Sequence, residues 1–398
     1  MNDTAIVYLD HAATTPVAPE VLETMLPFFR EEFGNSSSLH RAGGRAARAV
    51  EAAREQVAAL IGARSPDELV FTSGGTESDT WAVTGTVCAG PRKHVIASAI
   101  EHHAVLETVR AVRRLFGCEE TVLPVDGDGL IDPASLRESL RDNTALVSVM
   151  HANNEVGTLQ PVRELAQIAH ERGALFHTDA VQTVGKIPLD VEEVGIDLLS
   201  LSAHKFYGPK GVGALYIRRG TKIEPLHRGG GQEQGRRAGT VNVPGAAGMG
   251  AAAALARSRE AVAARREWDL VELLWSRLFS AIPGIRRNGH AEKRIPGILN
   301  VSIEGVDGEV VLFALDRSGI LVSTGSACAA GSMLPSHVLR AMGVPPELAR
   351  GSVRFSLGRE TGEGDIARVA DVLPGVVERL RALSPSSGKR APHEITNT

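Results

Sequence analysis

Cysteine is scarce in this chain, which has three cysteines among 398 residues and no Cys-x-x-Cys pair. So few thiols exclude a disulfide framework and are typical of proteins in a reducing compartment. No apolar stretch approaches the roughly 20 residues that a membrane-spanning helix needs. The N-terminus also lacks a basic segment followed by an apolar one, so no secretory signal is predicted. We therefore expect a cytoplasmic protein with no membrane partner.

A strong excess of positive charge is absent as well. The formal net charge is −4, and basic pairs such as Arg113-Arg114 and Arg236-Arg237 are scattered along the chain. This distribution argues against direct binding of nucleic acid. The 43% of hydrophobic residues is typical of a globular protein with a sizeable core, and the length fits one large domain with a smaller one or two of similar size.

Short apolar segments rich in β-branched residues alternate with helical patterns through the middle of the chain. The apolar segments cover residues 68–72, 94–98, 145–150, 174–179, 197–202 and 213–218. One of the helical patterns between them, residues 161–173, opens with proline and closes with glycine, which commonly start and end helices. This alternation predicts an α/β fold with a doubly wound, mostly parallel sheet.

The composition changes after Pro244. Residues 245–282 predict one long helix or two broken ones, and shorter apolar segments followed by a last helical pattern continue to about residue 383. We expect a smaller α+β domain in this part of the chain. Residues 384–398 have almost no apolar side chain, and we expect them to be a disordered tail.

Polar residues follow several of the predicted strands. The segment "SGGTESD" after residue 72 is a glycine turn entering a helix, and such a turn can cradle a phosphate, although it is common elsewhere. Asp179 ends an apolar strand, where an unpartnered carboxylate is costly. Lys205 follows another strand, and such a loop lysine is usually only solvated. Together, a phosphate cradle, a strand-end carboxylate and a strand-end lysine are the parts that pyridoxal phosphate requires.

A series of longer motifs extends from Tyr8 to Arg359. In chain order it consists of "YLDHAATTP", "FTSGGTESD", "EHHAVLETV", "HANNEVG", "HTDAVQTVGK", "SAHKFYGPKGVGALY", "GGGQEQGRRAGT" and "SVRFSLGR". This series resembles the signature segments of the cysteine desulfurases, which are pyridoxal-phosphate enzymes of the class-V aminotransferase group.

The resemblance implies the type I aminotransferase fold in a homodimer with active sites at the subunit interface. On this basis we assign residues 15–257 to a large domain that binds pyridoxal 5'-phosphate. Residues 1–14 and 258–383 form the small domain, which carries a catalytic cysteine loop at about residues 322–335.

The same resemblance implies roles for individual residues. Lys205 forms the Schiff base with the cofactor and moves the proton on the substrate α-carbon. Asp179 pairs with the pyridine nitrogen, Gln182 bonds the ring O3, and His102 stacks on the ring. The other residues implied are Gly75, Thr76, Ser202, Ala203 and His204 around the phosphate, Thr240 from the partner subunit, Asn154 at cofactor and substrate, and Arg354 on the substrate carboxylate.

Cys328 lies in "GSACAAGS", among side chains too small to pack, and this composition predicts an exposed, flexible loop. The resemblance implies that Cys328 attacks the sulfur of L-cysteine held on the cofactor as an aldimine and then a ketimine. The products are an enzyme persulfide and L-alanine. Since a free thiol has a pKa of about 8.5, it must first lose its proton, and we hypothesise that His102 takes part in that transfer. The motif "STGSAC" resembles group I of the family, the NifS and IscS branch.

The remaining expectations concern metals, partners and alternatives. No intrinsic metal is expected, and a transient iron–sulfur ligand role for Cys328 is the one metal role considered. The implied partner is a sulfur-acceptor protein in iron–sulfur cluster assembly, in thio-cofactor synthesis, or in thiolation of tRNA or a secondary metabolite. The polar tail lacks the apolar residues with which the housekeeping branch docks its scaffold. The alternatives are a selenocysteine lyase, another class-V aminotransferase, or a non-catalytic scaffold.

Overall fold

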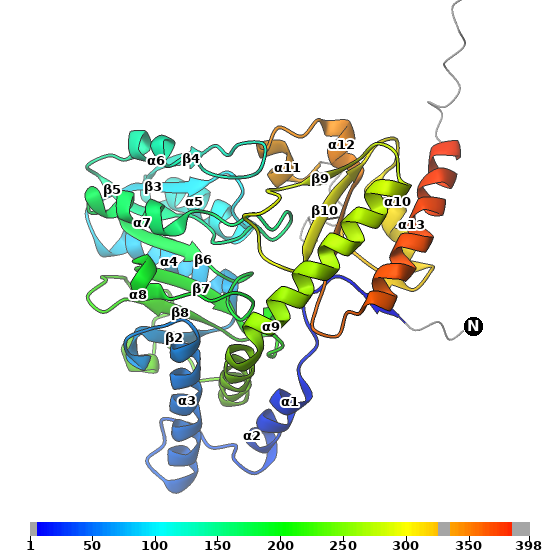
Figure 1. Ribbon diagram of the computed structural model, residues 1–398. Helices are drawn as coiled ribbons and strands as arrows, with labels where there is room; N and C mark the ends of the chain where they lie inside the picture. The colour runs from blue at the N-terminus through cyan, green and yellow to red at the C-terminus, as the bar shows by residue number, and fades with distance from the viewer. Residues whose placement is uncertain (1–5, 325–334, 384–398) are drawn as a thin grey trace, which may run out of the picture.

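The structure of the chain is a computed structural model that describes residues 6–324 and 335–383, apart from the side chains of residues 260 and 261 (Figure 1). The predicted catalytic residue Cys328 and the predicted disordered tail therefore lie outside the described residues. Among the residues described, no helix is long and apolar enough to cross a membrane.

A seven-stranded sheet forms the centre of the larger part of the molecule. Its strands are β2 (Leu69–Thr72), β3 (His94–Ser98), β4 (Glu119–Leu123), β5 (Thr144–Ser148), β6 (Leu175–Asp179), β7 (Leu198–Ser202) and β8 (Gly213–Ile217). Their order is β2-β8-β7-β6-β5-β3-β4, and only β8 runs antiparallel to its neighbours. The mostly parallel sheet predicted from the sequence is confirmed. The sequence pattern missed β4, an edge strand whose polar residues leave it half exposed.

Helices cover both faces of this sheet, so it is doubly wound as predicted. Ile96 of β3 packs into a core shared with α3 (Arg41–Leu60), α7 (Val162–Glu171) and the first half of α9 (Val243–Ala281). Its neighbours Val95 and Ala97 face the opposite core, which contains residues of α4 (Gly75–Ala89) and α5 (His103–Phe116). The alternation of side chains along a buried strand thus builds two layers of core. The shorter helices of this part are α1 (Pro19–Met25), α2 (Pro27–Arg30), α6 (Pro133–Ser139) and α8 (Val191–Val194).

A second, smaller part follows along the 39-residue helix α9, which Figure 1 shows running from the large sheet toward a small one. Residues 245–282 were predicted as one long helix or two broken ones, and they form a single helix. The strands of this part are β1 (Val7–Tyr8), β9 (Ile285–Asn288), β10 (Ile298–Ile303), β11 (Ile320–Leu321) and β12 (Ser352–Ser356), and its helices are α10 (Gly308–Asp316), α11 (His337–Ala341), α12 (Pro346–Arg350) and α13 (Glu363–Leu383). β12, β10 and β9 form one antiparallel sheet, whereas β1 pairs with β11 in parallel.

The small part has its own core, which begins at Leu270 in α9 and includes Val7 and Leu9 from the N-terminal segment. The core of the large part ends at Ala253 in the same helix. The boundary that we predict between residues 257 and 258 therefore falls within a continuous helix, and the division into domains stays a prediction.

The buried histidine His177 on β6 makes stability depend on pH. Its ring is fully buried between Ser148 and Ser200, and burial lowers its pKa to about 3. An unfolded histidine titrates near 6.5, so below that pH the unfolded chain binds a proton that the folded chain excludes. We expect His177 to lower the free energy of unfolding by about 1.4 kcal/mol per pH unit as the pH falls from 6 toward 4.

Urea unfolding at several pH values measures this contribution as the slope of the free energy of unfolding against pH. His177→Asn should give a shallower loss of stability below pH 6 than the unsubstituted protein, whatever its stability at pH 7. His40→Asn is the matched control, because His40 is exposed and caps α3 through its side chain, as asparagine can. An unchanged slope in His177→Asn would show that His177 does not exclude its proton in the folded state.

Candidate active site

A cavity of about 310 Å³ lies where the parallel strands of the large sheet end. Asp179 ends β6, Ser202 ends β7, and His102 follows β3, so the chain direction brings their side chains to one edge of the sheet. Arg354 enters from β12 of the small sheet and closes the other side. The cavity is thus built by both parts of the molecule.

Most of the predicted site residues line this one cavity. They are Gly75, Thr76, His102, Asn154, Asp179, Gln182, Ser202, His204, Lys205 and Arg354. Ala203 is fully buried and Thr240 is exposed, and neither is among the lining residues. Since Thr240 was assigned from the partner subunit, its role stays a prediction, as does that of Cys328 outside the described residues.

Lys205 is held at the cavity by the segment that follows β1. A single 3₁₀ turn, Ala203–Lys205, carries the lysine directly after β7. Its Nζ donates to the carbonyl oxygens of Ala12, at 2.5 Å, and Ala13, at 2.9 Å. These bonds fix the amino group of Lys205 at the carboxyl ends of strands β6 and β7. The positive charge of Lys205 lowers the pKa of the nearby Asp179 carboxylate.

Asp179 is a buried carboxylate in a cavity that favours a positive partner. Burial raises its pKa, whereas the charges of His102 and Lys205 and a 2.9 Å hydrogen bond from the Val181 amide lower it. Asp79 lies behind it, and burial together with the charge of Asp179 raises the pKa of Asp79 well above its usual value. A cationic nitrogen beside Asp179 would stabilise its ionised form.

His102 is the N-cap of α5, and this position sets its protonation. Its Nδ1 accepts a hydrogen bond from the Ala104 amide at 3.1 Å. Burial lowers the pKa of the ring, so at neutral pH the imidazole is uncharged and carries its proton on Nε2. His102 can therefore donate a hydrogen bond from Nε2 into the cavity.

The start of α4 provides a cradle for an anion. Gly74 has φ +154°, a conformation that favours glycine, and no side chain caps the first turn of the helix. A Cβ at Gly75 would come within 2.8 Å of the Val181 side chain, so a larger residue here would force the Val181 side chain or the start of the helix to shift. Thr76, Ser202 and His204 add polar side chains around this opening.

These features fit pyridoxal phosphate. The glycine cradle suits its phosphate, Asp179 suits its pyridine nitrogen, and Lys205 suits its aldehyde. The ring of His204 also fits a nearby phosphate, since burial and three lysines lower its pKa to about 4 and an anion would offset those charges.

Arg354 is positioned by its contacts on both sides. It is 1% exposed, its Nη2 pairs with Asp10 at 2.6 Å, and its Nη1 donates to the Asn154 carbonyl oxygen at 2.8 Å. The two contacts hold the guanidinium at the cavity, where a substrate carboxylate can bind it.

Several cavity residues were not predicted from the sequence. They include Asp79, His103, Glu155 and His337. Asp79 could have been found, because it lies three residues after Thr76 on the same face of α4. The Nε2 of His337, on the distant helix α11, donates to the Glu101 carbonyl oxygen, and no local pattern places it there.

Comparison with known proteins identifies the family of the chain. The aminotransferase class-V family model matches residues 7–369. Cysteine desulfurase IscS of Dictyoglomus turgidum is 52% identical over 381 residues, which cover 95% of this chain and 96% of the relative. The chain belongs to the cysteine desulfurases of the class-V aminotransferase family.

Two solved structures extend this comparison of the cysteine desulfurase fold. A NifS-like protein superposes with a TM-score of 0.88 at 39% identity, covering 94% of this chain and all (100%) of its own. SspA in complex with cysteine gives a TM-score of 0.79 at 37% identity and covers 88% of this chain and 98% of its own. The type I fold predicted from the motifs is thereby confirmed.

Asp179 is the first residue of this desulfurase cavity to test by a conservative change. Asp179→Asn keeps the shape but removes the charge that a protonated pyridine nitrogen needs. Losing one charged hydrogen bond, worth about 1.5–3 kcal/mol, should lower kcat/KM about ten- to one-hundred-fold. The measurement is L-alanine formation at pH 7, with Asp371→Asn on the exposed side of α13 as the control. Equal kcat/KM in the two variants would contradict the role of Asp179.

Proposed function

We propose that the chain is a cysteine desulfurase that converts L-cysteine to L-alanine with pyridoxal 5'-phosphate on Lys205. The sulfur would pass to Cys328 as a persulfide and then to an acceptor protein. The observation that carries this proposal is one cavity that joins a held lysine, a buried carboxylate and a buried arginine, namely Lys205, Asp179 and Arg354. Membership of the family supports the same activity.

Pyridoxal phosphate, when bound, supplies an electron sink for negative charge at the substrate α-carbon. The chain supplies the rest. Asp179 would keep the pyridine nitrogen protonated, the cradle at Gly75 would hold the phosphate, and Gln182 would bond the ring oxygen. The Nζ of Lys205 would accept the proton of the substrate α-carbon and carry it to its next position. The carbonyl groups of Ala12 and Ala13 hold this nitrogen at the cavity.

Substrate binding relies on Arg354. Because Asp10 and Asn154 hold the guanidinium, little side-chain freedom is lost when a carboxylate binds. The carboxylate of L-cysteine would therefore be fixed on the small-sheet side of the cavity. Its amino group would then face Lys205 on the opposite wall.

The transfer of sulfur to Cys328 needs no oxidant or reductant, because L-cysteine and the enzyme thiol together supply all the atoms and electrons of L-alanine and the persulfide. The C–S bond of cysteine breaks, an S–S bond to the Cys328 thiolate forms, and the carbon receives a proton to give alanine. The proton that the carbon receives balances the one that the Cys328 thiol loses, and the neutral ring of His102 would assist this transfer through a hydrogen bond from its Nε2. The terminal sulfur of the persulfide would then pass to a nucleophile of the acceptor protein as the S–S bond breaks and the Cys328 thiolate is restored, and the acceptor would serve iron–sulfur, thio-cofactor or nucleic-acid thiolation chemistry.

A homodimer is part of the proposal. Large apolar side chains are exposed on α1, α2 and the segment after them, which is unusual for a free surface: Leu22, Leu26, Phe29, Phe33 and Leu39. A second copy of the chain would cover this surface and would bring its exposed Thr240 toward the neighbouring phosphate cradle. The cytoplasmic location stays a prediction from the sequence.

The test is the stoichiometry of the reaction with L-cysteine and a reductant. The proposal predicts one L-alanine for each sulfide released by the holoenzyme. A class-V aminotransferase would give a keto acid and no sulfide. A selenocysteine lyase would release alanine from L-selenocysteine but not from L-cysteine, and either result would contradict the proposal.

A further inference from the structure

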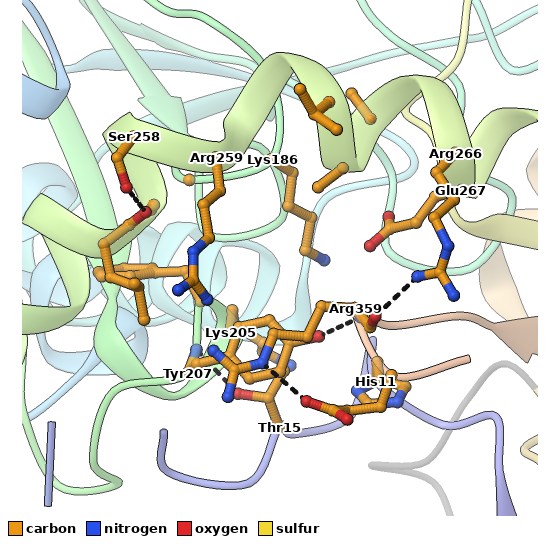
Figure 2. Close-up of a pocket in the computed structure, with 18 of the residues that line it drawn as sticks. His11, Thr15, Lys186, Lys205, Tyr207, Ser258, Arg259, Arg266, Glu267 and Arg359 are labelled. Carbon is orange, nitrogen blue, oxygen red and sulfur yellow. Dashed lines mark hydrogen bonds and ion pairs between the residues drawn. The ribbon is translucent and has the colours of Figure 1, made fainter. Parts of the chain in front are cut away.

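A second cavity, of about 700 Å³, shares Lys205 with the cofactor cavity. Figure 2 shows Lys186 and Glu267 pointing into it, with His11 at its edge. Lys205 lines both cavities, so the second cavity is adjacent to the lysine that would bind the cofactor. Lys186 lines the second cavity and is hydrogen-bonded to Gln182, which lines the cofactor cavity.

A chain of hydrogen bonds leads from Lys186 to Lys205. The Lys186 Nζ donates to the Gln182 Oε1 at 3.0 Å, and the Gln182 Nε2 donates to the Ala12 carbonyl oxygen at 2.9 Å. The same carbonyl oxygen accepts from the Lys205 Nζ at 2.5 Å. Gln182 and Lys205 therefore share one acceptor.

These contacts allow one orientation of the Gln182 amide. An ammonium group has only donors and a carbonyl has only acceptors, so the amide oxygen must face Lys186 and the amide nitrogen must face Ala12. The opposite orientation would set two donors against each other at Lys186 and two acceptors against each other at Ala12. The –NH₂ group has a second hydrogen, which leaves a donor for the cofactor cavity that Gln182 lines.

The surroundings of Lys186 contain charges of both signs. Glu267 of α9 is 9% exposed and faces it across the cavity, and its negative charge favours the charged lysine. Burial nevertheless lowers the pKa of Lys186 to about 8, with a further contribution from Arg354, and burial raises the pKa of Glu267 to about 7. The nearby rings of His11 and His204 both have a pKa of about 4 and are neutral at pH 7.

We propose that Lys186 is a positioning residue that orients the Gln182 amide toward the ring oxygen of the cofactor. The inference rests on the proposed function, because it assigns Gln182 to that oxygen. A donor at the ring oxygen stabilises its negative charge most when the Schiff base is unprotonated, so it lowers the pKa of the Schiff base. Lys186 thus acts on Lys205 through Gln182.

The test is a pH titration of the Schiff-base absorbance in purified holoenzyme, with circular dichroism to confirm folding. Lys186→Met should raise the titration midpoint by about one pH unit, the size expected when a charged group loses one hydrogen bond. Lys186→Arg keeps a donor to Gln182, so its titration midpoint should stay close to that of the unsubstituted protein. Lys222→Met, at an exposed site, is the matched control and should not move the midpoint. If Lys186→Met does not fold, Lys186→Ala replaces it, since the cavity can admit water.

A double variant separates positioning from a direct effect of charge. If Lys186 acts through Gln182, adding Lys186→Met to Gln182→Ala leaves the midpoint of Gln182→Ala unchanged. Additive shifts, or no shift in Lys186→Met, would overturn the inference and leave the proposed function intact. Absence of any Schiff-base band in the unsubstituted protein would instead contradict the proposed function.

Discussion

Lys205→Ala is expected to remove the Schiff-base absorbance and to lower L-alanine formation at least about a thousandfold. The reason is geometric. The Nζ of Lys205 is anchored on Ala12 and Ala13 at the cofactor cavity, and the neighbouring Lys186 is bonded to Gln182 on the other side. Lys186 therefore cannot take over the bond to the aldehyde or the proton transfer.

Spectra of the purified variant, recorded with added pyridoxal phosphate, measure this effect together with alanine production. Lys210→Ala is a matched control, because Lys210 lies five residues further along the same loop and is exposed. It should keep the band and the rate within about twofold, as is usual for surface substitutions. A normal band in Lys205→Ala would mean that another amine holds the cofactor.

Cys328→Ala is expected to lower sulfide release from L-cysteine at least about a hundredfold while the Schiff-base band stays normal. The variant should still bind L-cysteine, because Arg354 and Lys205 are unchanged, so the spectrum should still respond to substrate. Loss of the nucleophile stops the reaction after binding, since neither of the other two cysteines lines the cavity that the structure describes. Sulfide assays and absorbance scans of the same sample separate the two steps.

The other cysteines provide the control for this variant. Cys88 on α4 is exposed, whereas Cys118 is buried and burial raises the pKa of its thiol. Neither residue lines the cofactor cavity as the structure describes it. Cys88→Ala should therefore keep full activity. Undiminished alanine release from Cys328→Ala would contradict the persulfide route.

The residues that the sequence predicted well are those whose position follows from local patterns. Asp179 and Lys205 stand directly after apolar strands, and parallel strands end at one edge of a sheet, so their proximity could be predicted. Gly75 begins a helix after such a strand. The family resemblance added Gln182, His102 and Arg354, which no periodicity would have brought together.

The residues that the sequence did not predict depend on packing between distant segments. Glu267 faces Lys186 only because α9 runs from the large sheet toward the small one, and Asp10 reaches Arg354 only through the course of the N-terminal segment. Edge strand β4 was missed because its exposed glutamates hide the apolar pattern of a strand. Such contacts arise from tertiary structure, for which a single sequence carries no local signal.

Mass spectrometry of the holoenzyme after one turnover shows directly whether Cys328 receives the sulfur of the substrate. The protein is mixed with one equivalent of L-cysteine without reductant, quenched and digested. If Cys328 carries the persulfide, the peptide that contains it gains the mass of one sulfur atom, and one equivalent of L-alanine appears. Alanine without added sulfur on Cys328, or added sulfur on Cys88 or Cys118 instead, would contradict this role of Cys328.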